Sequence, residues 1–234
     1  MKRIFPILSV ITAALLGYAL YAALVIAPTE QTMGDVQRIF YYHVPSAWTA
    51  FLLFLINFVA SVVYLIRKNP VADIVALVCA EVGVAFCTVV LITGPLWARP
   101  VWGIWWTWDI RLTSTLVLWL IYVAYLMLRR FSSSGQTPVL AAALAIFGAL
   151  DVPLVYFSIW FFRTQHPQPV IGGGGSIDPR MLRVFALNCL AFTCYAGLIC
   201  WFRYRVERMQ RDVEETQALE ALLEPKGASS GGAR

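Results

Sequence analysis

Charged residues are scarce in this chain of 234 residues. They make up 13% of the sequence, whereas hydrophobic residues make up 60%. A typical soluble domain has roughly 25% charged residues, so this balance excludes an ordinary soluble fold. The net charge of +5 is modest, and its basic residues gather at the ends of apolar segments. We therefore expect no nucleic-acid partner.

Several chemical motifs are also missing. The five cysteines form no Cys-x-x-Cys pair, which excludes a thiol redox motif and a covalent c-type haem site. There is no Gly-x-x-x-x-Gly-Lys-Ser/Thr loop, and the glycine run at 172–175 is followed by serine without the required lysine. Any nucleotide hydrolysis linked to this protein must therefore belong to a partner.

Long apolar runs are abundant. Each is near the ~20 residues that a helix needs to cross ~30 Å of hydrocarbon. They cover residues 4–27, 47–66, 71–93, 112–128, 138–162 and 182–202. The first run is longer than the ~7 to 15 residues of a signal-peptide core, so we expect it to be retained. The sequence predicts an all-α polytopic membrane protein, a bundle of six transmembrane helices.

The distribution of basic residues predicts the orientation of this bundle. Twelve of the eighteen lysines and arginines fall at one set of alternate helix ends, together with both termini. The positive-inside rule places that side in the cytoplasm of a bacterial inner membrane. The outward loops would then be 28–46, 94–111 and 163–181. The second is rich in tryptophan and the third in glycine.

The chain divides into a membrane domain at 1–205 and a charged tail at 206–234. The start of the tail has the charge spacing of a helix, and its last residues, GASSGGAR, have the composition of a disordered end. Two interpretations stay open for the tail. We favour a solvated extension of the last span over a docking helix, because charge runs are usually solvated faces.

The residues that could bind a ligand lie on the predicted outer face. Five of the nine tryptophans lie within 97–113, which reads WARPVWGIWWTWDIRLT, and the only two histidines, His43 and His166, lie on the same face. Flat rings beside charge favour a flat ligand. The apolar spacing over 33–43 predicts a short interfacial helix carrying His43, and Pro45 suits the first turn of the second span.

Two interpretations of this patch compete. Tryptophan concentrates at membrane interfaces for its own reasons, and a lone histidine at a helix end is more often hydrogen-bonded than ligating. Convergence of both histidines on the tryptophans favours haem, because imidazole commonly binds haem iron and arginines can neutralise propionates. Zinc is a weaker candidate, since no third ligand stands nearby.

These residues carry a family resemblance. The segment 102–109, WGIWWTWD, resembles the signature WGxxWxWD of the tryptophan-rich haem-handling proteins of cytochrome c assembly. Six spans, with one outer histidine before the second and one after the fifth, are similar to the haem exporter C (cytochrome c maturation protein C) family. The segments at 40–48, 93–103 and 151–167 agree, and the resemblance extends to about Arg205.

The resemblance implies a site and a function. It implies that haem b is held non-covalently as cargo at the periplasmic face, with no enzymatic activity. His43 and His166 would be the axial ligands of the iron. The other residues of the site would be Trp97, Trp102, Trp105, Trp106, Trp108, Asp109 and Arg111. Of these, Asp109 would shape the loop through Arg111 or an indole N–H rather than touch haem.

The resemblance also implies partners. The haem would be presented to a membrane-anchored periplasmic haem chaperone. An ABC-type ATPase subunit, its membrane subunit and a small single-span subunit would complete the complex. The alternative is a haem-translocating transporter subunit, which would need polar residues through the membrane. A quinone-binding or electron-transfer subunit would carry histidine pairs inside its spans, and none are there.

Two acidic residues lie within the predicted spans, where ionised groups are costly. Either Glu81 and Asp151 are protonated and hydrogen-bonded inside the bundle, for example to Asn57 or Asn188, or one of them lies on a path or at a contact with the transporter subunits. Pro153 should free a backbone carbonyl and kink the fifth span.

Overall fold

The computed structural model describes residues 4–132, 134–162, 164–166 and 177–223. Nearly all of these residues are helical. The helices, in chain order, are α1 (Ile4–Tyr21), a π-helical turn η1 (Ala22–Ile26), a 3-10 turn η2 (Asp35–Ile39), α2 (Phe40–Arg67), α3 (Pro70–Trp102), α4 (Ile110–Phe131), α5 (Thr137–Ala149), α6 (Asp151–Phe161) and α7 (Pro179–Leu223).

Within the described residues, six helical segments are long and apolar enough to cross a membrane. They coincide with the six apolar runs of the sequence, and α5 and α6 together make up the fifth. The predicted all-α bundle of six spans is therefore confirmed. The helices extend past the apolar runs at several ends, and these extensions position the site described below.

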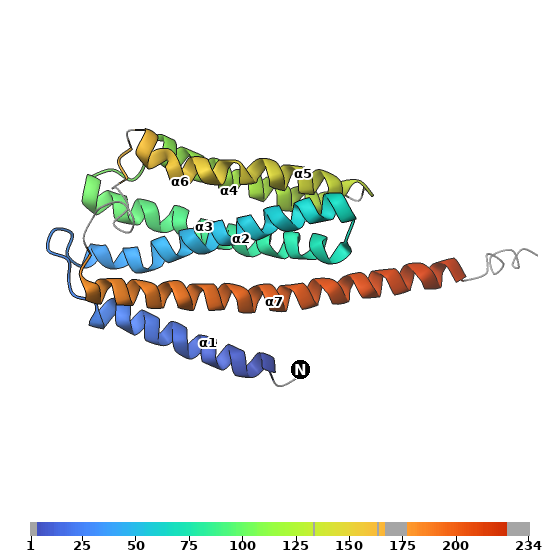
Figure 1. The fold of residues 1–234 in the computed structure, drawn as a ribbon, viewed down its shortest axis with the longest axis horizontal. Coiled ribbons are helices and arrows are strands. Elements are labelled where there is room, and N and C mark those ends of the chain that lie inside the picture. Colours follow the sequence, from blue (N-terminus) through green and yellow to red (C-terminus); the bar gives the residue numbers. More distant parts are fainter. Residues whose placement is uncertain (1–3, 133, 163, 167–176, 224–234) are drawn as a thin grey trace, which may run out of the picture.

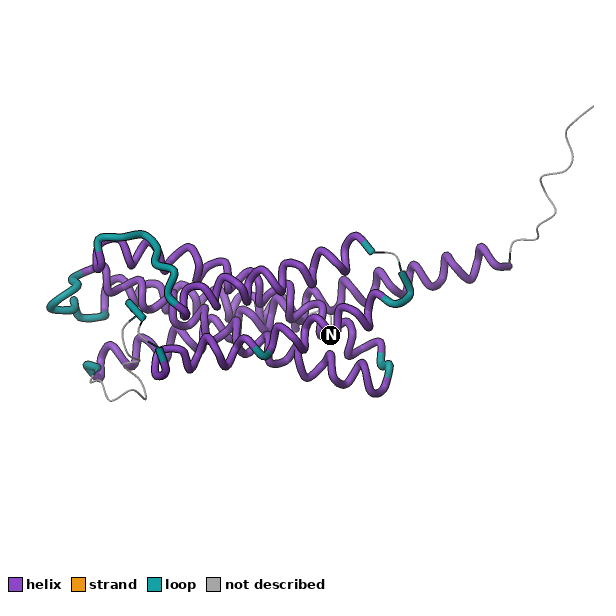
Figure 2. Tube along the Cα trace, turned by 90° about the horizontal axis from the view of Figure 1, so that it is seen from above, coloured by secondary structure: helices purple, strands orange, loops and turns teal. Residues whose placement is uncertain are grey.

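The bundle has α2 and α3 at its centre. In Figure 1, α1 and α7 lie together along one side of this pair, and α4, α5 and α6 lie along the other. The start of α1 and the extended end of α7 lie at the same end of the bundle. Figure 2 shows that the long loops gather at the opposite end. Chain segments 28–34, 103–109 and 164–166 therefore meet there.

Close helix packing fills the middle of the bundle. The rings of Phe54 on α2 and Tyr122 on α4 stack with centroids 3.8 Å apart and an interplanar angle of 12°. Both side chains are fully buried. Gly83 on α3 makes room for this stack, since a Cβ there would lie only 2.7 Å from Phe54 Cε1. The core below the loop-bearing end is thus closed by aromatic rings.

The fifth span is broken near its middle. Helix α5 ends at Ala149 and α6 begins at Asp151. Pro153 has no N–H to offer the carbonyl of Ala149, and a tighter bond from Leu150 N to Phe147 O, 3.2 Å long, closes the turn. The helix is thus interrupted at Leu150, close to Pro153, and the kink itself stays a prediction. The Asp151 Oδ2 atom is buried without a hydrogen-bond partner among the described residues.

Of the two alternatives for Glu81, a hydrogen bond from Asn57 or Asn188 is wrong, and a path or contact involving transporter subunits stays a prediction. The Glu81 carboxylate accepts two hydrogen bonds from the Arg203 guanidinium, at 2.8 and 2.9 Å, rather than one from Asn57 or Asn188. Those amides instead donate to backbone carbonyls, Asn57 to Ala76 and Asn188 to Val184. A charged pair with bidentate geometry therefore joins α3 to α7, which is the usual state for ionisable groups within a membrane.

A second ionic cluster lies further along α7, around Arg211. Asp73 at the start of α3 is buried and accepts from Arg129 on α4 at 2.8 Å. Arg211 on α7 lies 2.9 Å from the same carboxylate and also pairs with Glu207. Helix α7 runs without a break from Pro179 to Leu223, so the tail is helical through Leu223 and its first turns contact the bundle. The division at residue 205 stays a prediction.

Replacing Gly83 by alanine should destabilise the bundle. The added Cβ must displace the Phe54 ring, whose neighbours leave no space, and overpacking of this kind costs about 1–3 kcal/mol. Thermal unfolding of the detergent-purified protein measures the loss. Gly17→Ala is the matched control, because nothing lies within 4 Å of a Cβ at Gly17 and a helical glycine replaced by alanine gains stability. Equal unfolding temperatures for the two variants would contradict the close approach.

Candidate functional site

Two adjoining cavities open at the loop-bearing end of the bundle. The first, of about 210 Å³, is mainly apolar and reaches down between α2, α3 and α4 as far as Cys87 and Thr115. The second, of about 710 Å³, is more polar and lies against the 28–37 segment and the start of α7. We call them the apolar and the polar cavity. His43 and His166 line both, so they stand where the two cavities join.

His43 comes from the first turn of α2. The predicted interfacial helix over 33–43 is wrong in its extent, because the 3-10 turn Asp35–Ile39 leads directly into α2 at Phe40. Pro45 accordingly lies inside α2 and not in a separate start of the span. The His43 ring is buried. Its Nδ1 lies 2.8 Å from Thr93 Oγ1, and its edge meets Trp97 with centroids 5.9 Å apart.

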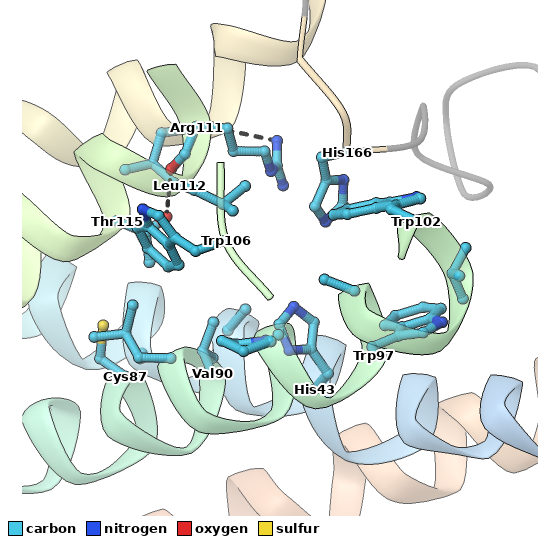
Figure 3. Close-up of a pocket in the computed structure, with 18 of the residues that line it drawn as sticks. His43, Cys87, Val90, Trp97, Trp102, Trp106, Arg111, Leu112, Thr115 and His166 are labelled. Atoms are coloured by element: carbon cyan, nitrogen blue, oxygen red, sulfur yellow. Dashed lines mark hydrogen bonds between the residues drawn. The ribbon is translucent and has the colours of Figure 1, made fainter. Parts of the chain in front are cut away.

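His166 approaches from the opposite wall, in the segment that follows α6. Figure 3 shows its ring and that of His43 directed into the same cavity from two sides, with Arg111 and Trp102 next to His166. Its backbone N–H donates to the hydroxyl oxygen of Thr164, 3.0 Å away. The next residue back, Gln165, donates its N–H to Asp109 Oδ2 at 3.2 Å. This contact ties the His166 segment to the tryptophan-rich loop.

The expected outer loop at 94–111 is shorter than predicted. Helix α3 continues through Pro95 and Pro100 to Trp102, which places Trp97 and Trp102 on a helix. Gly103 then ends the helix with a φ of 78°, the left-handed conformation that favours glycine. The Arg99 side chain bonds to the carbonyl of Gly103, so it supports this turn and does not line the cavities.

Asp109 organises the loop from its other end. Its Oδ1 accepts from Leu112 N at 3.0 Å and so caps the start of α4. Its Oδ2 accepts from the Thr107 hydroxyl at 3.0 Å as well as from Gln165. The structure thus gives Asp109 the loop-shaping geometry that the sequence suggested, through these three donors rather than through Arg111 or an indole.

Trp106 and Arg111 both line the apolar cavity, and each carries nitrogen donors. The Trp106 Nε1 donor is buried and has no hydrogen-bond partner among the described residues. Arg111, the second residue of α4, donates over 3.3 and 3.5 Å to the carbonyls of Val155 and Tyr156. Long contacts such as these are weak, so the guanidinium retains donor capacity for an anionic group beside it.

Two of the predicted site tryptophans stand apart from the cavities. Trp105 is 56% exposed and Trp108 is 77% exposed. Trp108 packs edge-on against Trp106, with centroids 5.8 Å apart. Among the predicted residues the structure therefore brings together His43, His166, Trp97, Trp102, Trp106 and Arg111. It leaves Trp105 and Trp108 outward and assigns Asp109 to support.

The wall of the polar cavity is held by two arginines. Arg38 donates to the carbonyl of Ala23 at 2.8 Å and so fastens the 3-10 turn to the end of the first span. Arg180 bonds to Asp178 at 2.9 Å, and these hydrogen bonds hold the pKa of Asp178 below its ordinary value. Asp178 therefore stays ionised beside this cavity.

Sequence reasoning missed Thr93 as part of the site. The apolar run ends at this residue, so the span was expected to end there. Because α3 continues, Thr93 and Trp97 lie one turn apart on the same face, and both contact His43. The missed signal is the four-residue spacing from Thr93 to Trp97, which marks one helical face only once the helix is known to continue.

These features define a class of protein. The chain is a polytopic helical membrane protein. It has a pocket walled by aromatic side chains, and two histidines point into this pocket from opposite sides. Comparison with known proteins narrows the class, because residues 1–219 match the model of the heme exporter protein C family. The chain belongs to that family.

Individual relatives agree along most of their length. A heme exporter protein C from Bradyrhizobium diazoefficiens is 34% identical over 94% of this chain and 84% of its own. The heme exporter protein C of Escherichia coli is 31% identical over 76% of this chain and 73% of its own. An Arabidopsis thaliana mitochondrial protein, named for cytochrome c biosynthesis, is 34% identical over 90% and 82%.

Replacing Asp109 by alanine should remove the cap of α4 and the contact with Gln165. Loss of the helix cap costs about 0.5–2 kcal/mol of unfolding free energy, and the amide of Gln165 should exchange faster with solvent. Thermal unfolding and hydrogen exchange measure the two effects. Asn69→Ala is the matched control, since Asn69 caps α3 at the far end through Val71 N. An unchanged exchange rate of the Gln165 amide in Asp109→Ala would contradict the link between the tryptophan-rich loop and the segment that carries His166.

Proposed function

We propose that this protein binds haem non-covalently, as cargo, with His43 and His166 as the two axial ligands of the iron. One observation carries the proposal: the chain's only two histidines, 123 residues apart in number, line the same cavity from opposite walls (Figure 3). Two imidazoles facing each other suit six-coordinate haem iron. The adjoining polar cavity lies within the ~300–1,000 Å³ usual for small-molecule sites.

The surrounding groups suit a porphyrin. Trp97, Trp102 and Trp106 offer apolar faces around the cavity. The guanidinium of Arg111 offers donors for propionate oxygens. The two histidines would therefore hold the iron, and the tryptophans and arginine would hold the ring and its carboxylates.

The site is proposed to face the periplasm. The end of the bundle opposite the cavities carries most of the basic residues. Helix α7 extends beyond the bundle at this end. The positive-inside rule assigns that end to the cytoplasm of a bacterial inner membrane. Both termini would then be cytoplasmic, and the haem would be held at the outer surface.

Handover to a periplasmic haem chaperone is the proposed next step in cytochrome c biogenesis. Trp105 and Trp108 remain exposed at the rim, and exposed tryptophans are typical contact residues of protein interfaces. Since the chain has no nucleotide-binding motif, energy would come from an ABC-type ATPase subunit with its membrane subunit. A small single-span subunit completes the proposed complex. The protein itself would act as a carrier and not as an enzyme.

The closed core favours presentation over translocation through this bundle. The apolar cavity ends near Cys87 and Thr115. One turn deeper, the stacked and fully buried rings of Phe54 and Tyr122 fill the space between the helices. A path for haem through the bundle would require this stack to separate.

Removing either histidine should change the haem spectrum. The purified protein is expected to show the Soret band of six-coordinate, low-spin haem, because two nitrogen ligands impose a strong field. His43→Ala and His166→Ala should each shift the band toward five-coordinate, high-spin haem and weaken retention. Absorption and electron paramagnetic resonance spectroscopy measure this change. Asn188→Ala, which removes a buried polar side chain that lines neither cavity, serves as control. Parent-like spectra in both histidine variants would rule out the axial assignment.

The tryptophans should differ in their effects. Trp106→Phe reduces the apolar ring area that lines the cavity, and loss of this contact area with the porphyrin should lower haem affinity by about fivefold. Trp105→Phe should leave the affinity of the isolated protein unchanged, because its ring lies outside the cavity. Haem titration of the two purified variants measures the difference. Equal affinities would leave Trp106 as an ordinary interfacial residue.

A further inference from the structure

The hydrogen bonds around His43 determine which of its ring nitrogens carries the proton. Thr93 Oγ1 lies 2.7 Å from the carbonyl oxygen of Val89, four residues earlier on α3. A carbonyl can only accept, so the single hydroxyl proton of Thr93 is donated to it. The same Oγ1 lies 2.8 Å from His43 Nδ1. With its proton already committed, the hydroxyl can only accept from the imidazole.

It follows that Nδ1 of His43 holds the proton and donates it to Thr93. A neutral imidazole has one N–H and one bare nitrogen, so Nε2 is the nitrogen with a free lone pair. Figure 3 shows a ring nitrogen of His43 directed into the cavity, toward the side from which His166 enters. The nitrogen that faces the cavity is thus the one able to bind a metal.

The orientation of the ring is fixed from a second direction. Trp97 lies one helical turn after Thr93 and meets the His43 ring edge-on, with an interplanar angle of 79°. The His43 side chain is buried, so these contacts have little competition from water. One face of α3 therefore sets both the rotation and the protonation of the ring.

We propose that Thr93 is a positioning residue, which holds His43 in the Nδ1-protonated form and aims Nε2 at the haem iron. This inference rests on the proposed function, because it assigns His43 to the iron. A hydrogen bond from the far nitrogen makes an imidazole a stronger electron donor to its metal, and ligating histidines usually have such a partner. Thr93 has no contact with the cavity of its own, so it acts through His43.

Four single variants test the proposal on the full-length, detergent-purified protein. Thr93→Val keeps the shape and the branched Cβ but removes the acceptor. Thr93→Ser keeps the hydroxyl. Thr88→Val is the matched control, because the Thr88 hydroxyl likewise donates to a carbonyl on α3, that of Val84, and accepts from another ring, Trp119 Nε1, at 2.8 Å. His43→Ala tests the underlying assignment.

Thr93→Val should lower haem affinity by about 10- to 100-fold, the range found when a partner of a metal ligand is lost. It should also raise the reduction potential of the bound haem, because a less electron-donating ligand favours ferrous iron. Titration with haem and a spectroscopic redox titration measure the two quantities. Thr93→Ser should restore both toward the parent values, and Thr88→Val should leave both unchanged.

The outcomes distinguish a failure of the role proposed for Thr93 from a failure of haem binding by His43. If His43→Ala disturbs haem but Thr93→Val matches the parent in affinity and potential, His43 is a ligand and the positioning role of Thr93 is wrong. If Thr93→Ser fails to restore the potential, the methyl group and not the hydroxyl matters, and the proposal is likewise overturned. If His43→Ala itself leaves the haem spectrum unchanged, the proposed function fails first.

Discussion

A bilayer core offers no hydrogen bonds to peptide groups, and this constraint determines where a site built on loops can lie. The chain meets it with continuous helices, so irregular backbone gathers at the ends of the bundle (Figure 2). The turn at 103–109 and the segment at 164–166 lie at one such end. The break at Leu150 is internal, and there Pro153 removes the donor that would have continued the helix. A pocket walled by tryptophans and two histidines could form only where several helices end together.

Much of this fold follows from the sequence, because hydropathy summed over about 20 residues depends little on how the helices pack. The ends of the helices do not follow in this way. Helix α3 continues past Thr93 through Pro95 and Pro100, since a proline in a membrane helix is tolerated where neighbouring groups satisfy the freed carbonyls. Trp97 and Trp102 consequently became wall residues on a rigid helix.

The site was predictable to a similar degree. His43 and His166 stood out because they are the only histidines, and Trp106 and Arg111 because of their motif. Thr93 did not stand out, because its contact with His43 depends on how α2 and α3 rotate against each other. The partner of Glu81 was missed for the same reason, since Arg203 lies 122 residues away and no local spacing connects them.

The signature motif combines two kinds of residue. Gly103 ends α3 and Asp109 caps the start of α4, so two of the motif's fixed positions set the backbone. The tryptophans between them, Trp106 and Trp108, line the cavity or lie exposed at the rim. Asp109 also joins the His166 segment to this loop through a 3.2 Å contact, and Arg111 reaches α6 over 3.3 Å or more. His43 is held within a helix pair by bonds of 2.7 and 2.8 Å. The two walls are therefore supported in different ways: contacts within a helix pair position His43, and the loop capped by Asp109 supports the segment that carries His166.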